Sequence, residues 1–283
     1  MNHLRIGVPS KGRLAEVTAE LLKEAGLSFR RQERSLFARC KEIPVDITFL
    51  RTEDIPVLCA EGAIDMGVTG GDLLAEAGVD LVRRLDLGVG ECRLSLCVPQ
   101  DSPIQSPSQL DGCRVATSFP HVTEKFLAAH GAKPRLVHLS GAVEIMITLG
   151  VAEAIVDLVE TGSTLAANRL RILQDIDRYQ TVLVQNHQVR EPQWADRVVR
   201  RLEGVVIART YSLLEYNIPR AELPAAEQIT PGFNSPTVSA LEDSAWCAVR
   251  VMVERTNVIE IMERLEALGA SAILETQIKN CRL

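Results

Sequence analysis

One short segment of the chain combines residue types and spacing that suit ligand chemistry. Its apolar run, residues 154–159, is interrupted by a single acid, Asp157, and leads directly into Glu160-Thr161-Gly162-Ser163-Thr164. A helical pattern over Leu165–Leu173 follows, so unpaired backbone amides and the positive end of a helix dipole would lie beside three hydroxyl groups. Gly162 would let the backbone approach a bound anion closely. The pattern indicates a phosphate-binding loop, and a simple helix cap explains it equally well.

Asp157 favours a ligand site over a simple cap. It stands between the apolar residues Val156 and Leu158, where a carboxylate without a partner is costly. Its spacing of four residues from Thr161 suits a sugar phosphate, because the loop would hold the phosphate while the acid accepts hydrogen bonds from ribose hydroxyls. Glu144 is a second acid among apolar neighbours, and it is either another ribose ligand or an exposed helical glutamate.

The elements that must position this segment alternate between strands and helices. Helical spacing begins at Leu14 and stops at Gly26, and a new helix is expected after Gly70-Gly71-Asp72. This alternation is typical of βαβ units and a mostly parallel sheet. Other elements predicted in the first third of the chain are, in order, Leu4–Val8 (strand), Val45–Leu50 (strand), Ile55–Glu61 (helix) and Ile64–Thr69 (strand).

The same pattern starts again at Cys92, with predicted strands at Leu94–Val98 and Cys113–Thr117. Residues 63–74 can also be laid on residues 154–165 without gaps, and five of the twelve positions are identical. We therefore predict two similar α/β lobes with a cleft between them. An apolar stretch at 181–184 would return the chain to the first lobe. The predicted limits are 1–91 with 181–208 for the first lobe and 92–180 for the second.

Residues 211–283 have a different order of predicted strands and helices from the rest of the chain. Their predicted order βαββαβ is the ferredoxin-like pattern. A small domain of this kind attached to an α/β body is more often a ligand sensor or an oligomerisation unit than a catalyst. The predicted elements are, in order, Tyr211–Tyr216, Pro219–Gln228 (helix), Pro236–Leu241, Trp246–Glu254, Val258–Leu268 (helix) and Ser271–Ile278.

Composition sets the wider limits. The 283 residues are 46% hydrophobic and 24% charged, which excludes disordered and fibrous classes. The net charge of −6 argues against a general nucleic-acid binder, since phosphate contacts need a basic surface. No apolar run is long enough to span a membrane, and no signal peptide is evident. Seven cysteines without a Cys-x-x-Cys pair indicate buried thiols in the cytoplasm, and the scattered histidines suggest no metal site.

Several motifs, taken together and in order, resemble the long form of the ATP phosphoribosyltransferase family, the first enzyme of histidine biosynthesis. Each motif alone is weak, but they are spread over nearly the whole chain in the family's order. The motifs are Pro9-Ser10-Lys11-Gly12-Arg13-Leu14, Gly67-Val68-Thr69-Gly70-Gly71-Asp72, Gly141-Ala142-Val143-Glu144, Asp157-Leu158-Val159-Glu160-Thr161-Gly162-Ser163-Thr164-Leu165 and Pro231-Gly232-Phe233-Asn234-Ser235-Pro236-Thr237-Val238.

The resemblance implies a fold, a reaction and a regulator. The fold would be two periplasmic-binding-protein-like lobes around a cleft, followed by a ferredoxin-like regulatory domain. The reaction would join N1 of the adenine of ATP to C1 of 5-phosphoribosyl 1-pyrophosphate, giving N1-(5-phosphoribosyl)-ATP and pyrophosphate. Mg²⁺ would be the cofactor, held mainly by substrate phosphates. Histidine would inhibit by feedback, and dimers would assemble into hexamers.

The resemblance also assigns roles to residues of this sequence. The catalytic group would be Lys11, Asp157 and Glu144, with the two acids on the ribose hydroxyls. The 5-phosphate would be held by Glu160, Thr161, Gly162, Ser163, Thr164 and Leu165. The nucleotide and pyrophosphate side would be formed by Arg13, Arg51 and Asp72, with Phe119 against the adenine. The histidine pocket would use Asn217, Thr237 and Ala272.

The sequence departs from the family at Asn217, where relatives commonly have aspartate. An amide keeps hydrogen bonding but loses charge attraction for the amino group of histidine, so weaker inhibition is expected. Two other functions stay open on the sequence alone: a two-lobed small-molecule binding protein without chemistry, and a regulatory paralogue that has lost catalysis. The missing signal peptide argues against the first, and the intact Lys11 and Asp157 argue against the second.

Overall fold

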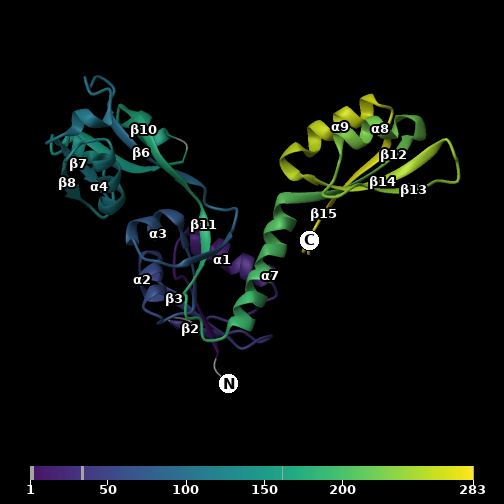
Figure 1. Ribbon diagram of the computed structural model, residues 1–283, viewed down its shortest axis with the longest axis horizontal. Helices are drawn as coiled ribbons and strands as arrows, with labels where there is room; N and C mark the ends of the chain where they lie inside the picture. The colour runs from purple at the N-terminus through teal and green to yellow at the C-terminus, as the bar shows by residue number, and fades with distance from the viewer. Residues whose placement is uncertain (1–2, 33–34, 161, 283) are drawn as a thin grey trace. The chain divides into compact units, whose positions relative to one another are not determined.

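The computed structural model describes residues 3–32, 35–160 and 162–282 (Figure 1). Contacts between residues divide the chain into two compact units. The first unit consists of Met1–Glu20 with Ser28–Ala195, and the second consists of Leu21–Leu27 with Asp196–Leu283. Residues 196–208 therefore group with the C-terminal part of the chain, whereas the sequence-based limits assign them to the first lobe. Those lobe limits stay a prediction.

The first sheet of the first unit has the strand order β2-β3-β1-β4-β11-β5. Strand β1 pairs in parallel with β3 and β4, whereas β11 runs antiparallel to β4 and β5. The strand at 181–185 thus joins the sheet that the N-terminal strands form. Its elements are β1 (Leu4–Pro9), α1 (Arg13–Glu24), β2 (Phe37–Arg39), β3 (Val45–Leu50), α2 (Ile55–Ala60), β4 (Met66–Gly70), α3 (Gly71–Ala77), β5 (Val82–Asp86) and β11 (Thr181–Gln185).

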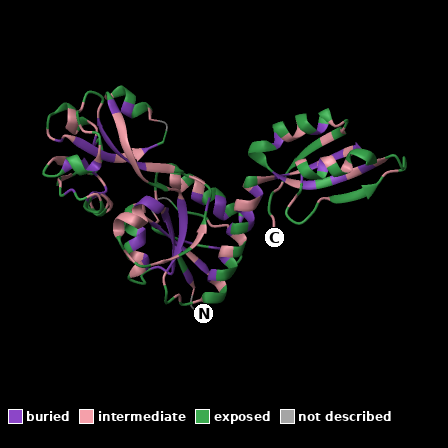
Figure 2. Ribbon diagram, turned by 45° about the horizontal axis from the view of Figure 1, so that its top comes forward, coloured by how far each residue is buried: buried purple, intermediate pink, exposed green. Residues whose placement is uncertain are grey.

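Two glycines in neighbouring parallel strands leave room for the side chains that pack on this sheet, one of them from α2. A Cβ atom added at Gly7 would lie 2.4 Å from Cδ1 of Ile64, and one added at Gly67 would lie 2.4 Å from Cγ2 of Ile55. Both strands are buried on both faces, as expected for parallel strands with helices on the sheet. Figure 2 shows these buried residues along the central strands. Because the two strands are parallel, the residues that follow each of them lie at the same carboxyl edge of the sheet, where ligands bind in such folds.

A second sheet in the first unit has the order β10-β6-β9-β7-β8. Strand β9 pairs in parallel with β7 and antiparallel with β6, and β6 pairs antiparallel with β10. The sheet is therefore mixed. Its elements are β6 (Cys92–Pro99), β7 (Arg114–Thr117), α4 (Pro120–Ala129), β8 (Arg135–His138), α5 (Ile145–Thr148), β9 (Ala154–Val159), α6 (Ser163–Ala167) and β10 (Leu170–Tyr179).

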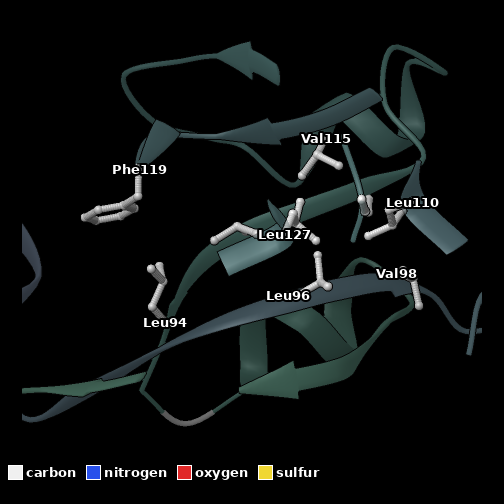
Figure 3. Close-up of a cluster of buried hydrophobic side chains, with 10 residues drawn as sticks. Leu94, Leu96, Val98, Leu110, Val115, Phe119 and Leu127 are labelled. Atoms are coloured by element: carbon white, nitrogen blue, oxygen red, sulfur yellow. The ribbon is translucent and has the colours of Figure 1, made fainter. Parts of the chain in front are cut away.

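The second sheet has an apolar cluster on each face. Figure 3 shows one of them, in which Leu94 and Leu96 of β6 meet Leu127 of α4. The opposite cluster contains Ile155 and Val159 of β9. Because side chains alternate along a strand, residue 157 lies on the same face as those two residues and not in the cluster of Figure 3.

The helix predicted over Leu165–Leu173 is present only at its start, and its predicted second half is wrong. Helix α6 ends at Ala167, Arg169 adopts a left-handed backbone with φ of 53°, and Leu170 already begins β10. Strand β10 pairs along its length with β6, and this long-range pairing outweighs the local helical spacing.

The second unit contains the predicted βαββαβ order, which is confirmed. Its sheet has the order β13-β14-β12-β15, and α8 and α9 cover one face (Figure 1). Strand β12 alternates accordingly, with Leu214 and Tyr216 buried towards the helices and Asn217 on the other face. The elements are α7 (Pro192–Thr210), β12 (Tyr211–Pro219), α8 (Leu223–Ile229), β13 (Thr237–Ala240), β14 (Trp246–Glu254), α9 (Val258–Ala267) and β15 (Ser271–Gln277).

Candidate active site

A cavity of about 470 Å³ lies at the end of β9 and the start of α6. It brings together both predicted ribose acids and the predicted phosphate loop, which lie up to 21 positions apart in the sequence, from Glu144 to Leu165. Thr161 lies outside the described residues. The lining side chains are Ala142, Glu144, Ile155, Asp157, Leu158, Val159, Glu160, Gly162, Ser163, Thr164 and Leu165.

The loop at the mouth of this cavity has an unusual backbone. Gly162 has φ of 78°, a left-handed conformation that side chains other than glycine adopt only with strain. It directly precedes α6, so the amides of the first turn of the helix, at Ser163 and Thr164, begin at the cavity. A Cβ atom added at Gly162 would meet nothing within 4 Å, so its glycine is required by the backbone and not by crowding.

Asp157 sits in the cavity as a half-buried carboxylate. Its Oδ1 atom accepts a hydrogen bond of 2.8 Å from the backbone amide of Leu158. Burial raises the pKa of Asp157 above its ordinary value, the Leu158 amide lowers it, and the negative charge of Glu144 raises it further. The strand thus holds a carboxylate in an environment that disfavours its charge, which is typical of a group kept for a ligand.

The segment that carries Glu144 is also strained. Ala142, which lines the cavity beside Glu144, has φ of 50°, in a region that costs a non-glycine residue of the order of 1 kcal/mol or more. Backbone strain of this kind persists where the surroundings require a particular geometry. Here it turns the chain so that Glu144 comes within electrostatic reach of Asp157.

Cationic side chains lie at the carboxyl edge of the first sheet. Lys11 and Arg51 follow β1 and β3, and because Pro9 and Leu50 are register partners, both residues leave the sheet at the same edge. All of Lys11, Arg13 and Arg51 are exposed. Arg13 Nη1 lies 3.7 Å from Oε2 of Glu160, so an ion pair joins this edge to the phosphate loop. The pair is exposed and contributes little stability by itself.

Asp72 follows β4 at the same edge, but it is 8% exposed. Burial raises its pKa, and hydrogen bonds with the backbone at Leu73 and at Asp72 itself offset part of that rise. A Cβ atom added at Gly70 would lie 2.1 Å from Oδ1 of Asp72, so the carboxylate folds back over the start of α3. Asp72 therefore shapes the loop after β4 and presents little surface to a ligand.

Comparison with known proteins decides the family. The family model described as ATP phosphoribosyltransferase matches residues 51–204, and the model described as HisG, C-terminal domain, matches residues 208–280. The ATP phosphoribosyltransferase of Rhodopirellula baltica is 64% identical over 280 residues, covering 99% of this chain and 94% of that protein. The chain belongs to the ATP phosphoribosyltransferase family. The presence of the C-terminal domain makes it a member of the long form.

Two further comparisons agree. The ATP phosphoribosyltransferase of Saccharopolyspora erythraea is 40% identical over 281 residues, covering 99% of this chain and the whole of that protein. Among solved structures, the ATP phosphoribosyl transferase (HisG:HisZ) complex from Thermotoga maritima matches with a TM-score of 0.64 and 30% identity, over 72% of this chain and 97% of that one. The match supports the two-lobed α/β architecture of the first unit.

Phe119 does not have the position that the family resemblance implies. Its side chain is 6% exposed and packs in the cluster with Leu94 (Figure 3). The backbone amide of Phe119 donates a 2.9 Å hydrogen bond to Oγ1 of Thr117, which helps to fix the position of this residue. A buried ring offers no open face for an adenine, so we assign Phe119 to packing at the start of α4.

The three residues predicted to bind histidine lie together in the second unit. Asn217, Thr237 and Ala272 all line one cavity of about 310 Å³ on the sheet face away from α8 and α9. Glu215 and Arg250 line the same cavity and form an ion pair with an Nη2–Oε1 distance of 2.7 Å. Ala272 has φ of 49°, a second strained alanine in a cavity wall. The cavity offers polar groups of both charges, as an amino acid requires.

Sequence reasoning missed a contact in the first unit that bears on the site. The backbone amides of His121 and Val122, in the first turn of α4, donate to the two carboxylate oxygens of Glu76 in α3, at 2.9 and 3.1 Å. Glu76 thereby caps a helix of the second sheet from a helix of the first. The contact joins a glutamate near the end of one helix to the start of a helix about 45 positions later, so no local pattern in the sequence predicts it.

Across the described parts of the chain, no cluster of three or more His, Cys, Asp or Glu side chains is placed to hold a metal ion. No helix within the same residues has the length and apolar character needed to cross a membrane. All seven cysteines are free thiols.

Proposed function

We propose that this chain transfers the 5-phosphoribosyl group of 5-phosphoribosyl 1-pyrophosphate to N1 of the adenine of ATP. The observation that carries the proposal is the cavity at the end of β9. There two acids suited to ribose hydroxyls and a glycine-led turn suited to a phosphate face the same space. Family membership supplies the reaction, and the cavity supplies a place for its sugar substrate.

In this proposal the turn from Gly162 to Leu165 holds the 5-phosphate through backbone amides and hydroxyl groups. Hydrogen bonds to a charged group contribute about 1.5–3 kcal/mol each, so a few of them hold a monophosphate well without a lysine. Asp157 and Glu144 accept hydrogen bonds from the ribose hydroxyls. Burial is the main cause of the raised pKa of Asp157 and the charge of Glu144 adds to it, so hydroxyl donors between the two acids would relieve part of this penalty.

The cationic edge of the first sheet would face the leaving group and the nucleotide. Lys11, Arg13 and Arg51 are long, exposed side chains at the carboxyl ends of neighbouring strands, where phosphate groups are commonly bound. Arg13 already contacts Glu160 of the phosphate loop, so it lies within reach of a substrate in the cavity. We assign these residues to stabilising the charge that develops on pyrophosphate.

The chemistry asks little of acid or base groups. Adenine N1 carries a lone pair, so it can form the bond to C1 as the bond from C1 to the pyrophosphate oxygen breaks, with the electron pair leaving on pyrophosphate. The protein therefore needs to align two anionic substrates and to stabilise the departing charge. Asp157 and Glu144 would also favour the positive charge that develops at the ribose carbon.

We propose Mg²⁺ as the cofactor, held mainly by substrate phosphates. The residues present fit a hard cation in part, because carboxylate oxygens are suitable ligands and the cavity is lined by three carboxylates, those of Glu144, Asp157 and Glu160. When bound, Mg²⁺ neutralises charge on the pyrophosphate that leaves.

We further propose that histidine binds in the cavity lined by Asn217, Thr237 and Ala272 and inhibits the enzyme. The ferredoxin-like domain that forms this cavity also suits assembly, and we expect dimers that associate into hexamers. The substrates ATP and phosphoribosyl pyrophosphate are cytoplasmic metabolites, so we expect the enzyme to act in the cytoplasm.

A direct assay tests the catalytic proposal. Purified protein is mixed with ATP, phosphoribosyl pyrophosphate and Mg²⁺, and the ultraviolet change of N1-substituted adenine is followed, with each substrate omitted in turn as a control. We expect a signal only in the complete mixture, and a strongly reduced one for Lys11→Ala. An unchanged spectrum in the complete mixture would refute the proposal and favour a binding protein or an inactive paralogue.

A further inference from the structure

A row of three polar side chains crosses the second sheet beside the cavity at the end of β9, which is the sugar-phosphate cavity of the proposed function. Asp157 of β9 is the register partner of Ser95 of β6. Ser95 is in turn the register partner of Asp175 of β10. Partners in antiparallel strands project from the same face of the sheet, with Cβ atoms about 4.5–5.5 Å apart. One hydroxyl group therefore lies between two carboxylates.

Two irregularities in β10 bring Asp175 to this row. The strand has a register shift against β6 on each side of Asp175. Without the first shift, which falls between Ile172 and Gln174, Gln174 would be the partner of Ser95. β-Bulges redirect side chains in this way, and they are frequent beside active sites. The bulged strand thus places an acid, and not an amide, opposite the hydroxyl group.

The hydroxyl hydrogen of Ser95 is held on one side of the row. Ser95 is fully buried, so its hydroxyl group needs an acceptor, and it donates a hydrogen bond of 2.7 Å to Oδ1 of Asp175. The other carboxylate oxygen of Asp175 lies 3.3 Å from Nη1 of Arg93. Within the described residues, no hydrogen bond joins Ser95 to Asp157. Serine has a single hydroxyl hydrogen, so its bond to Asp175 leaves none for Asp157.

A buried thiol on the same face responds to both carboxylates. Cys97 follows Ser95 by two positions in β6, so the two side chains share a face of the sheet. Burial raises the pKa of Cys97 to about 12, and the charges of Asp157 and Asp175 add to this rise. The two acids therefore lie on one face of the sheet, with β6 between them.

We infer that Ser95 and Asp175 are positioning residues that keep the carboxylate of Asp157 available to a ribose hydroxyl. The two acids compete for one donor. If Asp175 did not hold the hydrogen of Ser95, the buried hydroxyl would turn and donate to Asp157, because a buried donor without an acceptor is costly. Asp157 would then be held by β6, and part of its capacity as an acceptor would be used. This inference rests on the proposed function, in which Asp157 accepts hydrogen bonds from the ribose.

Calorimetry with ribose 5-phosphate tests the competition. The variants are Asp175→Ala, Ser95→Ala and the double variant that combines them. We expect Asp175→Ala to weaken binding about tenfold, because the released hydroxyl then competes with the sugar. Ser95→Ala should weaken it by less than about threefold. The double variant should bind within about threefold of the wild type, since it has no hydroxyl group that could turn to Asp157.

The double variant separates this role from a structural one. It loses Asp175 and releases Arg93 as the single variant does, so its recovery of binding can come only from the missing hydroxyl group. The control is Asp177→Ala, which removes an exposed acid from the same strand, opposite Leu94 on the other face of the sheet. It should bind ribose 5-phosphate within about twofold of the wild type. The KM for phosphoribosyl pyrophosphate should follow the same order as binding, while the KM for ATP stays constant.

A crystal structure of Asp175→Ala without ligand gives a readout that needs no substrate. Oγ of Ser95 should lie within about 3 Å of a carboxylate oxygen of Asp157. The inference is overturned if the hydroxyl group does not turn, or if the double variant binds as weakly as Asp175→Ala while wild-type binding and turnover are normal. If the hydroxyl group turns but the wild type does not bind ribose 5-phosphate, the proposed function fails and the competition for this hydrogen stands.

Discussion

Replacing Asp157 with asparagine should make the protein more stable and less active at the same time. The carboxylate lies half-buried in the wall of the sugar-phosphate cavity, and only Oδ1 has a protein donor among the described residues, the amide of Leu158 at 2.8 Å. In the proposed function, Oδ2 accepts a hydrogen bond from a ribose hydroxyl. Asparagine has nearly the same shape, keeps one acceptor oxygen for the Leu158 amide and removes the charge.

The loss of ligand binding follows from the kind of hydrogen bond that is lost. A hydrogen bond to a charged acceptor contributes about 1.5–3 kcal/mol, and one between neutral groups about 1 kcal/mol less. Exchanging one for the other at a ribose hydroxyl therefore costs about 1–2 kcal/mol, or about 5- to 30-fold in affinity for phosphoribosyl pyrophosphate. The electrostatic support for the developing charge at C1 is lost as well, so kcat should also fall.

The gain in stability follows from the raised pKa of Asp157, which burial causes first and the charge of Glu144 increases. Below the ordinary carboxyl pKa of 3.8 the group is protonated in both the folded and the unfolded chain, and the penalty is absent. As the pH rises from there through the folded pKa, the unfolded chain loses its proton more readily, and the wild type loses stability. Asparagine has no proton to lose, so the variant escapes this loss.

Urea unfolding at pH 7 and near pH 4 gives the measurement, together with the KM for phosphoribosyl pyrophosphate at pH 7. Asp157→Asn should unfold at higher urea than the wild type at pH 7, and the difference should shrink at the lower pH. Asp101→Asn, an exposed aspartate in the loop after β6, is the control and should change neither quantity. A less stable Asp157→Asn variant at pH 7 with unchanged KM would show that the carboxylate is a structural partner and would refute the reasoning.

Three more predictions concern Gly162, Glu76 and Asn217. Gly162→Ala and the control Gly112→Ala each place a Cβ atom in open space, at φ of 78° and 71°, so each variant should lose about 1 kcal/mol of stability. Only Gly162→Ala should raise the KM for phosphoribosyl pyrophosphate. Equal KM values for the two variants would contradict the role of the loop. Glu76→Ala removes both acceptors from the start of α4 and should lower urea stability by about 1 kcal/mol, with Glu76→Gln between it and the wild type; an unchanged midpoint would show that the cap is not made in solution. Asn217→Asp adds a negative charge to the C-terminal cavity, and calorimetry should find histidine bound about two- to fivefold more tightly, because an exposed pair contributes up to about 1 kcal/mol; weaker binding would place histidine elsewhere.

Much of the fold follows from short-range patterns in the sequence. Strands β1, β3 and β9 are apolar runs closed by glycine or polar residues, and the βαββαβ order of residues 211–283 is evident from alternating and helical spacing. Strand β10 is the instructive failure. Its residues have helical spacing, and only pairing with β6, more than seventy positions away, makes them a strand.

The candidate site shows the same division between local and long-range information. The loop after β9 was predictable, because a helix start, a glycine and hydroxyl residues are contiguous in the chain. The burial of Phe119 and the capping of α4 by Glu76 depend on tertiary packing, so spacing could not reveal them.

A crystal soaked with ribose 5-phosphate measures the central claim most directly. The account predicts phosphate density at the amides of Gly162 to Leu165, within hydrogen-bond distance, and ribose hydroxyls on Asp157. Sugar density at any other place, or phosphate density away from this loop, would contradict it.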